Sequence, residues 1–207
     1  MTPYDDPDLS EFAGYLTAKE PGRRERADAW ATAIGLQKVD GLKPSAHLYS
    51  VARRHIEGEI SASKARDLVD EYYETKTGRE LPEDLKEADK VSARIIEVIN
   101  DEGFFLSPAY LAALHGLIFE DVLSGAGGFR EVNIRKREWV LKDDSVTYGD
   151  WKAIGSGLDY AFDREKGFSY AHKPKRQVIT HFSRFIADIW KIHPFREGNT
   201  RTTAVFA

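Results

Sequence analysis

The residues best suited to chemistry lie together near the end of the chain. They form the segment His193-Pro194-Phe195-Arg196-Glu197-Gly198-Asn199-Thr200-Arg201. His193 is a candidate general base because imidazole titrates near neutral pH. Arg201 could contact an anion such as phosphate, and Glu197 fits a ligand for a Mg²⁺ ion that bridges phosphate oxygens. We therefore expect this segment to bind a metal-bound phosphate beside an imidazole.

Two helices should position this segment. Before it, apolar residues recur at helical spacing, at Val178, Ile179, Phe182, Phe185, Ile186, Ile189 and Trp190,. Pro194 disfavours helical angles at the residue before it, so we expect the helix to end at His193. From Gly198 to Phe206 a second helix is expected, whose first free N–H groups would form an anion site. A histidine and proline between helices can also be only a helix stop.

The segment resembles the signature of the Fic (filamentation induced by cAMP) family, His-x-Phe-x-[Asp/Glu]-Gly-Asn-Gly-Arg-x-x-Arg. Matches fall at His193, Phe195, Glu197, Gly198, Asn199 and Arg201. The resemblance implies a protein adenylyltransferase that transfers AMP from ATP to a hydroxyl side chain of a target protein. It implies that His193 deprotonates the hydroxyl, that Phe195 anchors the loop and that Glu197 holds Mg²⁺. The backbone of Gly198 to Thr200 and the side chain of Asn199 would bind the α-phosphate, and Arg201 would neutralise the β-phosphate.

Two positions depart from this signature. Thr200 stands where the family has glycine, and its Cβ restricts the backbone near the α-phosphate,. Ala204 stands where the family has its second arginine, which holds the γ-phosphate. Loss of such a charged contact would weaken nucleotide binding by about 1.5–3 kcal/mol. Two other functions are therefore compatible with these residues, a Fic enzyme that uses another nucleotide donor and a catalytically lapsed Fic-fold binding or regulatory protein.

Residues 1–76 are expected to form a small module of three short helices, with Ser61 as one N-cap,. The module resembles the antitoxins of class I Fic toxin–antitoxin pairs, whose inhibitory motif is [Ser/Thr]-x-x-x-Glu-[Gly/Asn]. In that register Leu36 takes the hydroxyl position, Asp40 the glutamate position and Gly41 the last position. The resemblance implies that this module regulates the site in cis. Alternatively, Asp40-Gly41 is only a helix cap and turn.

A polar stretch with Gly78 and Pro82 predicts a domain boundary, which places a Fic domain at residues 77–207,. Amphipathic helices are expected around residues 82–101, 108–118 and 151–162, with His115 as a packed core histidine. Between them, alternation over residues 129–134 and 139–141 predicts a β-hairpin with a basic tip at residues 135–137,. The resemblance identifies this hairpin as the flap that docks the target, through Val132, Asn133 and Ile134.

Together these patterns predict a mostly α-helical fold, a Fic-type helical bundle with a β-hairpin flap and an N-terminal antitoxin-like module. The net charge of −4 argues against nucleic-acid binding,. The absence of cysteine and of a long apolar run suggests a cytoplasmic protein with no membrane span or signal peptide,. Family members continue with helices that complete the adenine pocket, so we expect the C-terminal part of the domain to be missing after Ala207, and Val205 and Phe206 to be exposed. Relatives paired with antitoxins make a bacterial type II topoisomerase subunit a candidate target.

Overall fold

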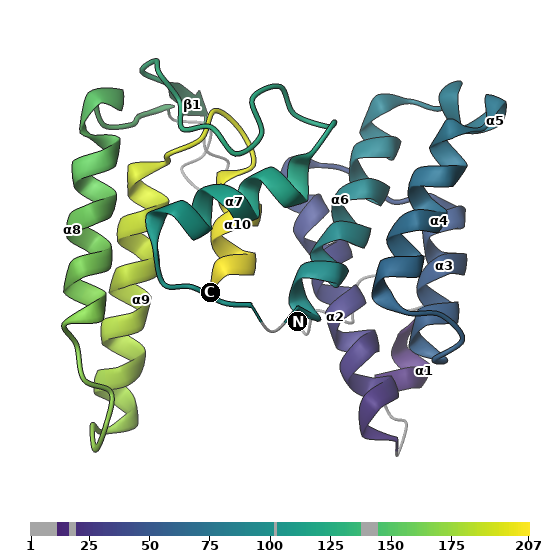
Figure 1. Ribbon diagram of the computed structural model, residues 1–207, viewed down its shortest axis with the longest axis horizontal. Helices are drawn as coiled ribbons and strands as arrows, with labels where there is room; N and C mark the ends of the chain where they lie inside the picture. Colours follow the sequence, from purple (N-terminus) through teal and green to yellow (C-terminus); the bar gives the residue numbers. More distant parts are fainter. Residues whose placement is uncertain (1–11, 17–19, 102, 138–144) are drawn as a thin grey trace. The chain divides into compact units, whose positions relative to one another are not determined.

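The computed structural model describes residues 12–16, 20–101, 103–137 and 145–207. It is mostly helical, with a small two-stranded antiparallel sheet, so the predicted fold class is confirmed (Figure 1). The chain divides into two compact units, Met1–Gly103 and Phe104–Ala207. In the described part of the chain, no helix is both long and apolar enough to span a membrane.

The first unit is a helical bundle. Its elements are α1 (Ala13–Leu16), α2 (Pro21–Gln37), η3 (Lys38–Asp40), α3 (Ala46–Ile56), α4 (Ala62–Glu74), α5 (Lys76–Arg79) and α6 (Glu83–Ile99). Helix α6 packs against both α2 and α4. The side chains of Ser45 and Ser61 cap α3 and α4 by accepting hydrogen bonds from Leu48 N and Lys64 N, so the predicted N-cap at Ser61 is confirmed,.

Hydrogen bonds and an ion pair stabilise the packing of α6 in this bundle. The carboxylate of Asp89 accepts hydrogen bonds from the Ser45 backbone N–H at 2.8 Å and from the Tyr73 hydroxyl at 2.9 Å. Burial raises the pKa of Asp89, while these hydrogen bonds act in the opposite direction,. On the same helix, Lys90 lies 3.1 Å from Asp70 of α4. These contacts explain why the structural division falls after Gly103, whereas the sequence predicted a boundary between residues 76 and 77.

The second unit places two helix pairs around the motif. Its elements are α7 (Pro108–Phe119), β1 (Arg135–Arg137), β2 (Ser145–Thr147), η5 (Trp151–Ala153), α8 (Ile154–Lys166), α9 (Lys175–Ile192) and α10 (Asn199–Phe206). Helix α8 packs along α9, and α10 packs against α7 and α9. Phe206 is 5% exposed and lies near Phe162 and Phe185, with ring centroids 5.6 and 6.2 Å away. The expected exposure of Phe206 was therefore wrong, because its ring joins the core.

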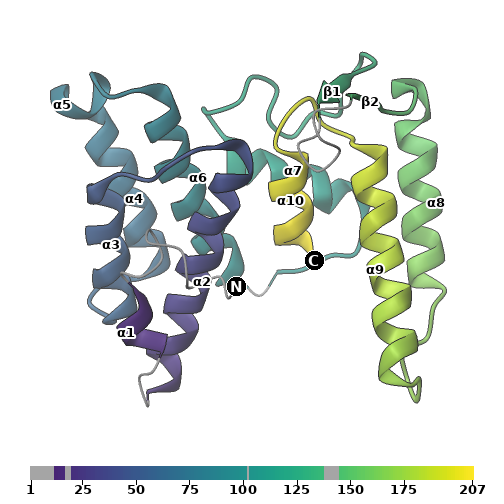
Figure 2. The same cartoon turned by 180° about the vertical axis from the view of Figure 1, so that it is seen from behind.

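The sheet lies beyond the C-terminal end of α9, at the same end as the loop that leads into α10 (Figure 2). Arg135 pairs with Thr147, Lys136 with Val146 and Arg137 with Ser145. The hairpin prediction was right in kind, but the basic run forms the first strand itself and not the tip. The predicted partner strand at residues 139–141 lies outside the described residues.

Candidate active site

His193 terminates α9 in a left-handed conformation, with φ 51° and ψ 61°. Its N–H still donates to the carbonyl of Ile189 at 3.2 Å, so the helix ends where Pro194 predicted it,. A non-glycine residue in this region costs about 1–2 kcal/mol. Neighbouring contacts must therefore hold the turn.

Arg130 supplies those contacts from a side chain that is 2% exposed. Its Nε donates to the His193 carbonyl at 2.9 Å, and its backbone N–H donates to the Pro194 carbonyl at 2.8 Å. Its two terminal nitrogens donate to Val132 O and Gly149 O, each at 2.8 Å. One guanidinium thus joins the motif loop to both ends of the flap. Burial lowers the pKa of Arg130, and the nearby carboxylate of Asp150 opposes this effect.

The imidazole of His193 is oriented by a backbone carbonyl. Its Nδ1 lies 3.1 Å from Trp190 O. Because a carbonyl can only accept, Nδ1 carries the proton and the lone pair lies on Nε2. The ring of Tyr148 stacks on the imidazole at 3.8 Å between centroids, and His193 is 3% exposed. The tautomer suits a general base, and the flap residue Tyr148 covers the ring.

Asn199 closes the loop with a reciprocal pair of hydrogen bonds. Phe195 N donates to its Oδ1, and its Nδ2 donates to Phe195 O, both at 2.8 Å. Phe195 is buried, as the anchoring role requires. The side chain of Asn199 is therefore occupied inside the loop. Of the predicted α-phosphate contacts, the backbone N–H groups of the first turn of α10 remain, because their N-cap residue supplies no side-chain acceptor.

His115 supports this loop from α7. Its Nδ1 accepts from Gly127 N–H at 2.9 Å, so its Nε2 carries the proton, which it donates to Glu197 O at 3.2 Å,. Its ring stacks on Phe195 at 3.9 Å between centroids. Burial lowers the pKa of His115 to about 4. The predicted packed core histidine is confirmed, and it also positions the backbone of Glu197.

Gly198 allows α10 to begin directly after the loop. It has φ 70°, and a Cβ there would lie 2.5 Å from the Phe119 ring,. The N-cap residue of α10 is Gly198, which has no side chain to cap the first turn. The guanidinium of Arg201 lies 4.7 Å from the centroid of the same Phe119 ring,. Thr200 accepts a hydrogen bond from Trp190 Nε1 at 3.2 Å, so its side chain points to α9 and away from the first turn.

Glu197 is exposed beside a cavity of about 520 Å³ that is also lined by His115, Arg130, Glu131 and Arg196. This volume is in the usual range for small-molecule sites. In residues 12–16, 20–101, 103–137 and 145–207, no group of three or more histidine or acidic side chains could hold a metal. A single carboxylate fits Mg²⁺, which usually keeps several waters and binds substrate phosphates. Glu197 would therefore share the ion with the ligand.

Ala204 is exposed and lines an apolar hollow of about 460 Å³ with Trp190 and Thr200. None of the described residues that line this hollow is charged, whereas the resemblance predicts an arginine at this position. The sequence alone shows that Ala204 departs from the signature, and the structure shows which residues surround it.

The predicted docking residues form the base of the flap and precede β1. Val132 O accepts from Arg130, and Ile134 O accepts from Tyr148 N at 3.1 Å. Asn133 Oδ1 accepts from Trp151 N at 2.9 Å. The resemblance predicts docking at these three residues, and the structure shows one oxygen atom of each engaged within the chain.

The predicted regulatory residues lie at the end of α2. Leu36 is in its last turn, Asp40 ends η3, and Gly41 has φ 74° in the cap position. The N–H of Leu42 donates to Gln37 O at 3.1 Å. This geometry is that of a helix cap, which was the alternative interpretation, and the regulatory role stays a prediction.

Comparisons with known proteins bear on the family and the fold. The model of the Fic/DOC family matches residues 105–207. A crystal structure of a Fic family protein from Desulfovibrio desulfuricans G20 is similar, with a TM-score of 0.53 and 14% sequence identity, over 96% of this chain and 53% of that one. This chain therefore spans about half the length of that protein, and the likeness shows the fold alone. No curated protein matches the chain. Residues 105–207 thus match the Fic/DOC family in sequence pattern, and the chain shares its fold with a Fic family protein.

Proposed function

We propose that this protein transfers AMP from ATP to a hydroxyl side chain of a target protein. One observation carries the proposal. An imidazole whose proton is held on Nδ1 by Trp190 O stands at the end of α9, and the uncapped first turn of α10 begins only six residues later in the sequence, at Asn199. This arrangement would hold a base and an anion site in one short loop.

In this reaction the first N–H groups of α10 would bind oxygens of the α-phosphate. Nε2 of His193 would take the proton of the target hydroxyl as its oxygen bonds to the α-phosphorus. The bond to the β-phosphate oxygen then breaks, and pyrophosphate leaves while the target keeps AMP. Arg201 would balance charge on the leaving group, and Mg²⁺ held by Glu197 would supply further charge neutralisation on the phosphates.

The flap offers an edge for the target. Tyr148 N donates to Ile134 O, so the alternation of an antiparallel pair directs the backbone groups of Arg135 and Arg137 away from β2,. A target strand added to this edge would be aligned by main-chain hydrogen bonds. Tyr148 directly follows β2 and stacks on His193, so it would have to move for a target hydroxyl to approach the imidazole across this face.

The test is label transfer from α-³²P-ATP in the presence of Mg²⁺. His193→Ala should abolish transfer while the circular dichroism spectrum is unchanged, because the proton acceptor is lost and the buried backbone contacts remain. Glu197→Gln should reduce transfer and shift the Mg²⁺ requirement to higher concentration, whereas Glu131→Gln in the same cavity should not. Undiminished labelling by His193→Ala would exclude this mechanism.

A different nucleotide donor is the second candidate, because Ala204 puts no cation where the family holds the γ-phosphate. Screening labelled ATP, GTP, UTP and CDP-choline separates the two. A catalytically lapsed binding protein would transfer none of them. We further propose that the N-terminal unit regulates the site and that a type II topoisomerase subunit is a candidate target. Both rest on the resemblance, and mass spectrometry of a lysate incubated with ATP tests the second.

A further inference from the structure

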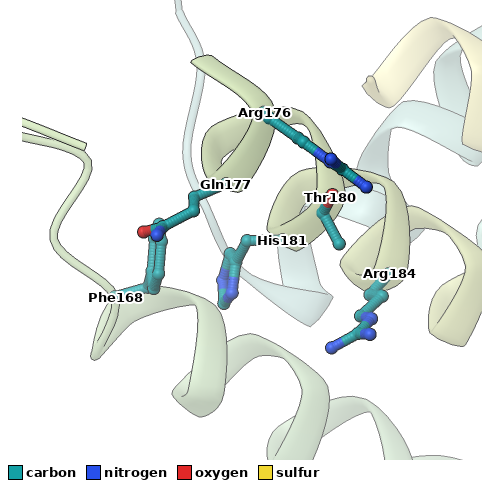
Figure 3. Close-up of a pocket in the computed structure, with 6 residues that line it drawn as sticks. All are labelled: Phe168, Arg176, Gln177, Thr180, His181 and Arg184. Carbon is teal, nitrogen blue, oxygen red and sulfur yellow. The ribbon is translucent and has the colours of Figure 1, made fainter. Parts of the chain in front are cut away.

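A groove runs along α9 on the side that meets the loop after α8. Six residues line it, and we call it the basic groove: Phe168, Arg176, Gln177, Thr180, His181 and Arg184 (Figure 3). Its volume is about 440 Å³. Arg176, Thr180 and Arg184 follow one another at four-residue intervals, so they share one face of the helix,.

The positive charge of this groove contrasts with the rest of the chain. The segment from Lys166 to Ala187, with Lys166 counted, contains five lysines and arginines and no acidic residue. The whole chain, in contrast, has a net charge of −4. Arg176 and Arg184 are both exposed. Within the described residues, neither guanidinium has an ion-pair or hydrogen-bond partner, unlike Arg164, which pairs with Asp188. The charge of these two arginines is therefore available to a ligand.

Two stacked rings form the floor of the groove. The rings of Phe168 and His181 stack at 3.5 Å between centroids and 7° between planes. His181 Nε2 lies 2.8 Å from the carboxylate of Glu165, which also accepts a hydrogen bond from the Tyr170 hydroxyl. Glu165 is 4% exposed. Its charge is thus buried and engaged behind the stacked rings, so a ligand in the groove meets an aromatic floor between two cations.

We propose that the basic groove docks an acidic segment of the protein substrate. This inference rests on the proposed transfer to a target protein. Along the helix, Arg176 and Arg184 are about 12 Å apart, which an extended peptide spans with carboxylates three or four residues apart. Thr180 precedes His193 by about 20 Å of helix, or roughly six extended residues. Strand β1, Arg135–Arg137, carries the same sign of charge, and its partner strand β2 leads into Tyr148, which stacks on His193.

An acidic polypeptide fits these features better than a nucleic acid does. A nucleic acid would meet repulsion from the net negative charge of the protein, because its phosphates extend well beyond one groove. A short acidic segment needs only the local charge. The two ligands make different predictions, so one binding experiment can decide between them.

The probe is a fluorescein-labelled peptide with four glutamates, six glycine or serine residues and one tyrosine. Its binding to the full chain is followed by fluorescence anisotropy in low salt. The wild-type protein should bind it at least tenfold more tightly than the same peptide with glutamines, and added salt should weaken binding. The double variant Arg176→Glu/Arg184→Glu should lose this preference. Arg24→Glu/Lys43→Glu makes the same change of net charge at exposed positions of the first unit and should keep it.

Three outcomes would overturn the proposal. They are equal binding of the glutamate and glutamine peptides, unchanged binding by the groove variant, and tighter binding of a twelve-nucleotide oligodeoxythymidine that the groove variant abolishes. Misfolding is excluded by thermal unfolding. Arg176 lies in the first turn of α9, where positive charge opposes the helix dipole, whereas Arg184→Glu sets a like charge four residues before Asp188,. These small effects oppose one another, so the groove variant should melt close to wild type.

The same peptides separate this inference from the proposed function. His193→Ala should bind the acidic peptide normally, since the groove lies elsewhere on α9. In the wild type, AMP transfer to the acidic peptide should show a lower KM than transfer to the glutamine peptide, with a similar kcat. If the acidic peptide binds but AMP is transferred to neither peptide and to no protein, the proposed transfer is refuted and docking in the basic groove still stands. Transfer with equal KM for both would refute the groove and leave the transferase.

Discussion

The guanidinium of Arg130 donates from Nε to the carbonyl of His193 at 2.9 Å. The same side chain donates to carbonyls at both ends of the flap, Val132 and Gly149. A left-handed histidine is thereby held by the residue that also fixes the strand pair. The position of the candidate base and the position of the strand pair, the proposed docking edge, consequently depend on one buried cation.

Substitution of Arg130 should therefore affect catalysis more than a single hydrogen bond would suggest. Arg130→Lys keeps the charge but cannot reach several carbonyls in different directions. Each carbonyl left without a partner costs about 1–3 kcal/mol, so we expect a lower melting temperature and a loss of kcat of at least a hundredfold. Arg135→Lys, on the exposed strand, is the matched control. If Arg130→Lys transferred AMP at the wild-type kcat, the loop that contains His193 would not need Arg130 to keep its conformation.

Gly198 should tolerate no side chain. Gly198→Ala introduces a left-handed alanine and places its Cβ 2.5 Å from the Phe119 ring. We expect a loss of about 2–4 kcal/mol in unfolding free energy from strain and overpacking. Gly41→Ala has a similar φ of 74° but open space around the Cβ, so it should lose only about 1–2 kcal/mol,. Denaturant unfolding measures the unfolding free energy of both variants. Equal losses would show that the contact with Phe119 adds nothing to the cost of Gly198→Ala.

Sequence patterns predicted the skeleton of this site well. The end of α9 at His193 and the start of α10 after Gly198 follow from Pro194 and from apolar spacing, which are local signals,. The strand pair was predicted in kind, but its register was not. Strand register depends on cross-strand partners, and a run of three basic residues has no alternating apolar pattern to define it,.

The contacts that orient the loop could not be predicted in this way. Arg130 lies 63 residues before His193, and a single arginine in an alternating stretch gives no sign that it is buried. Asn199 was assigned to phosphate because of its place in the motif, whereas its side chain bonds the backbone of Phe195. Such roles depend on tertiary contacts that no spacing rule contains. Likewise, the boundary prediction followed polar composition, but α6 belongs with α2 and α4.

His115 should make the Fic/DOC domain sensitive to acid. Its pKa is about 4 in the folded protein and about 6.5 when exposed, so the unfolded state binds more protons between these values,. Its contribution to stability is therefore present above pH 6.5 and is lost as the pH falls toward 4. The expected loss is roughly 3 kcal/mol. His115→Gln removes the titrating group, and its unfolding free energy should change less over this range.

The effect of His115 is the difference between the unfolding free energies of the wild type and His115→Gln at each pH. In the first unit, burial also lowers the pKa of His55, which adds acid sensitivity of the same sign. Burial raises the pKa of Asp89, which acts with the opposite sign,. Both contributions are common to wild type and His115→Gln, so they cancel. Parallel stability curves from pH 7 to pH 4 would contradict the assignment to His115.

The solubility of a truncated chain should depend on where the N-terminal part is cut off. Removal of residues 1–76 leaves α6 without α2 and α4, which exposes Val91, Ile95 and Ile96. Removal of residues 1–103 takes away the whole first unit. We expect the shorter chain, residues 104–207, to stay monomeric in size-exclusion chromatography and the chain of residues 77–207 to aggregate. If the first unit represses transfer, residues 104–207 should label targets faster than the full chain, whereas equal rates would exclude repression.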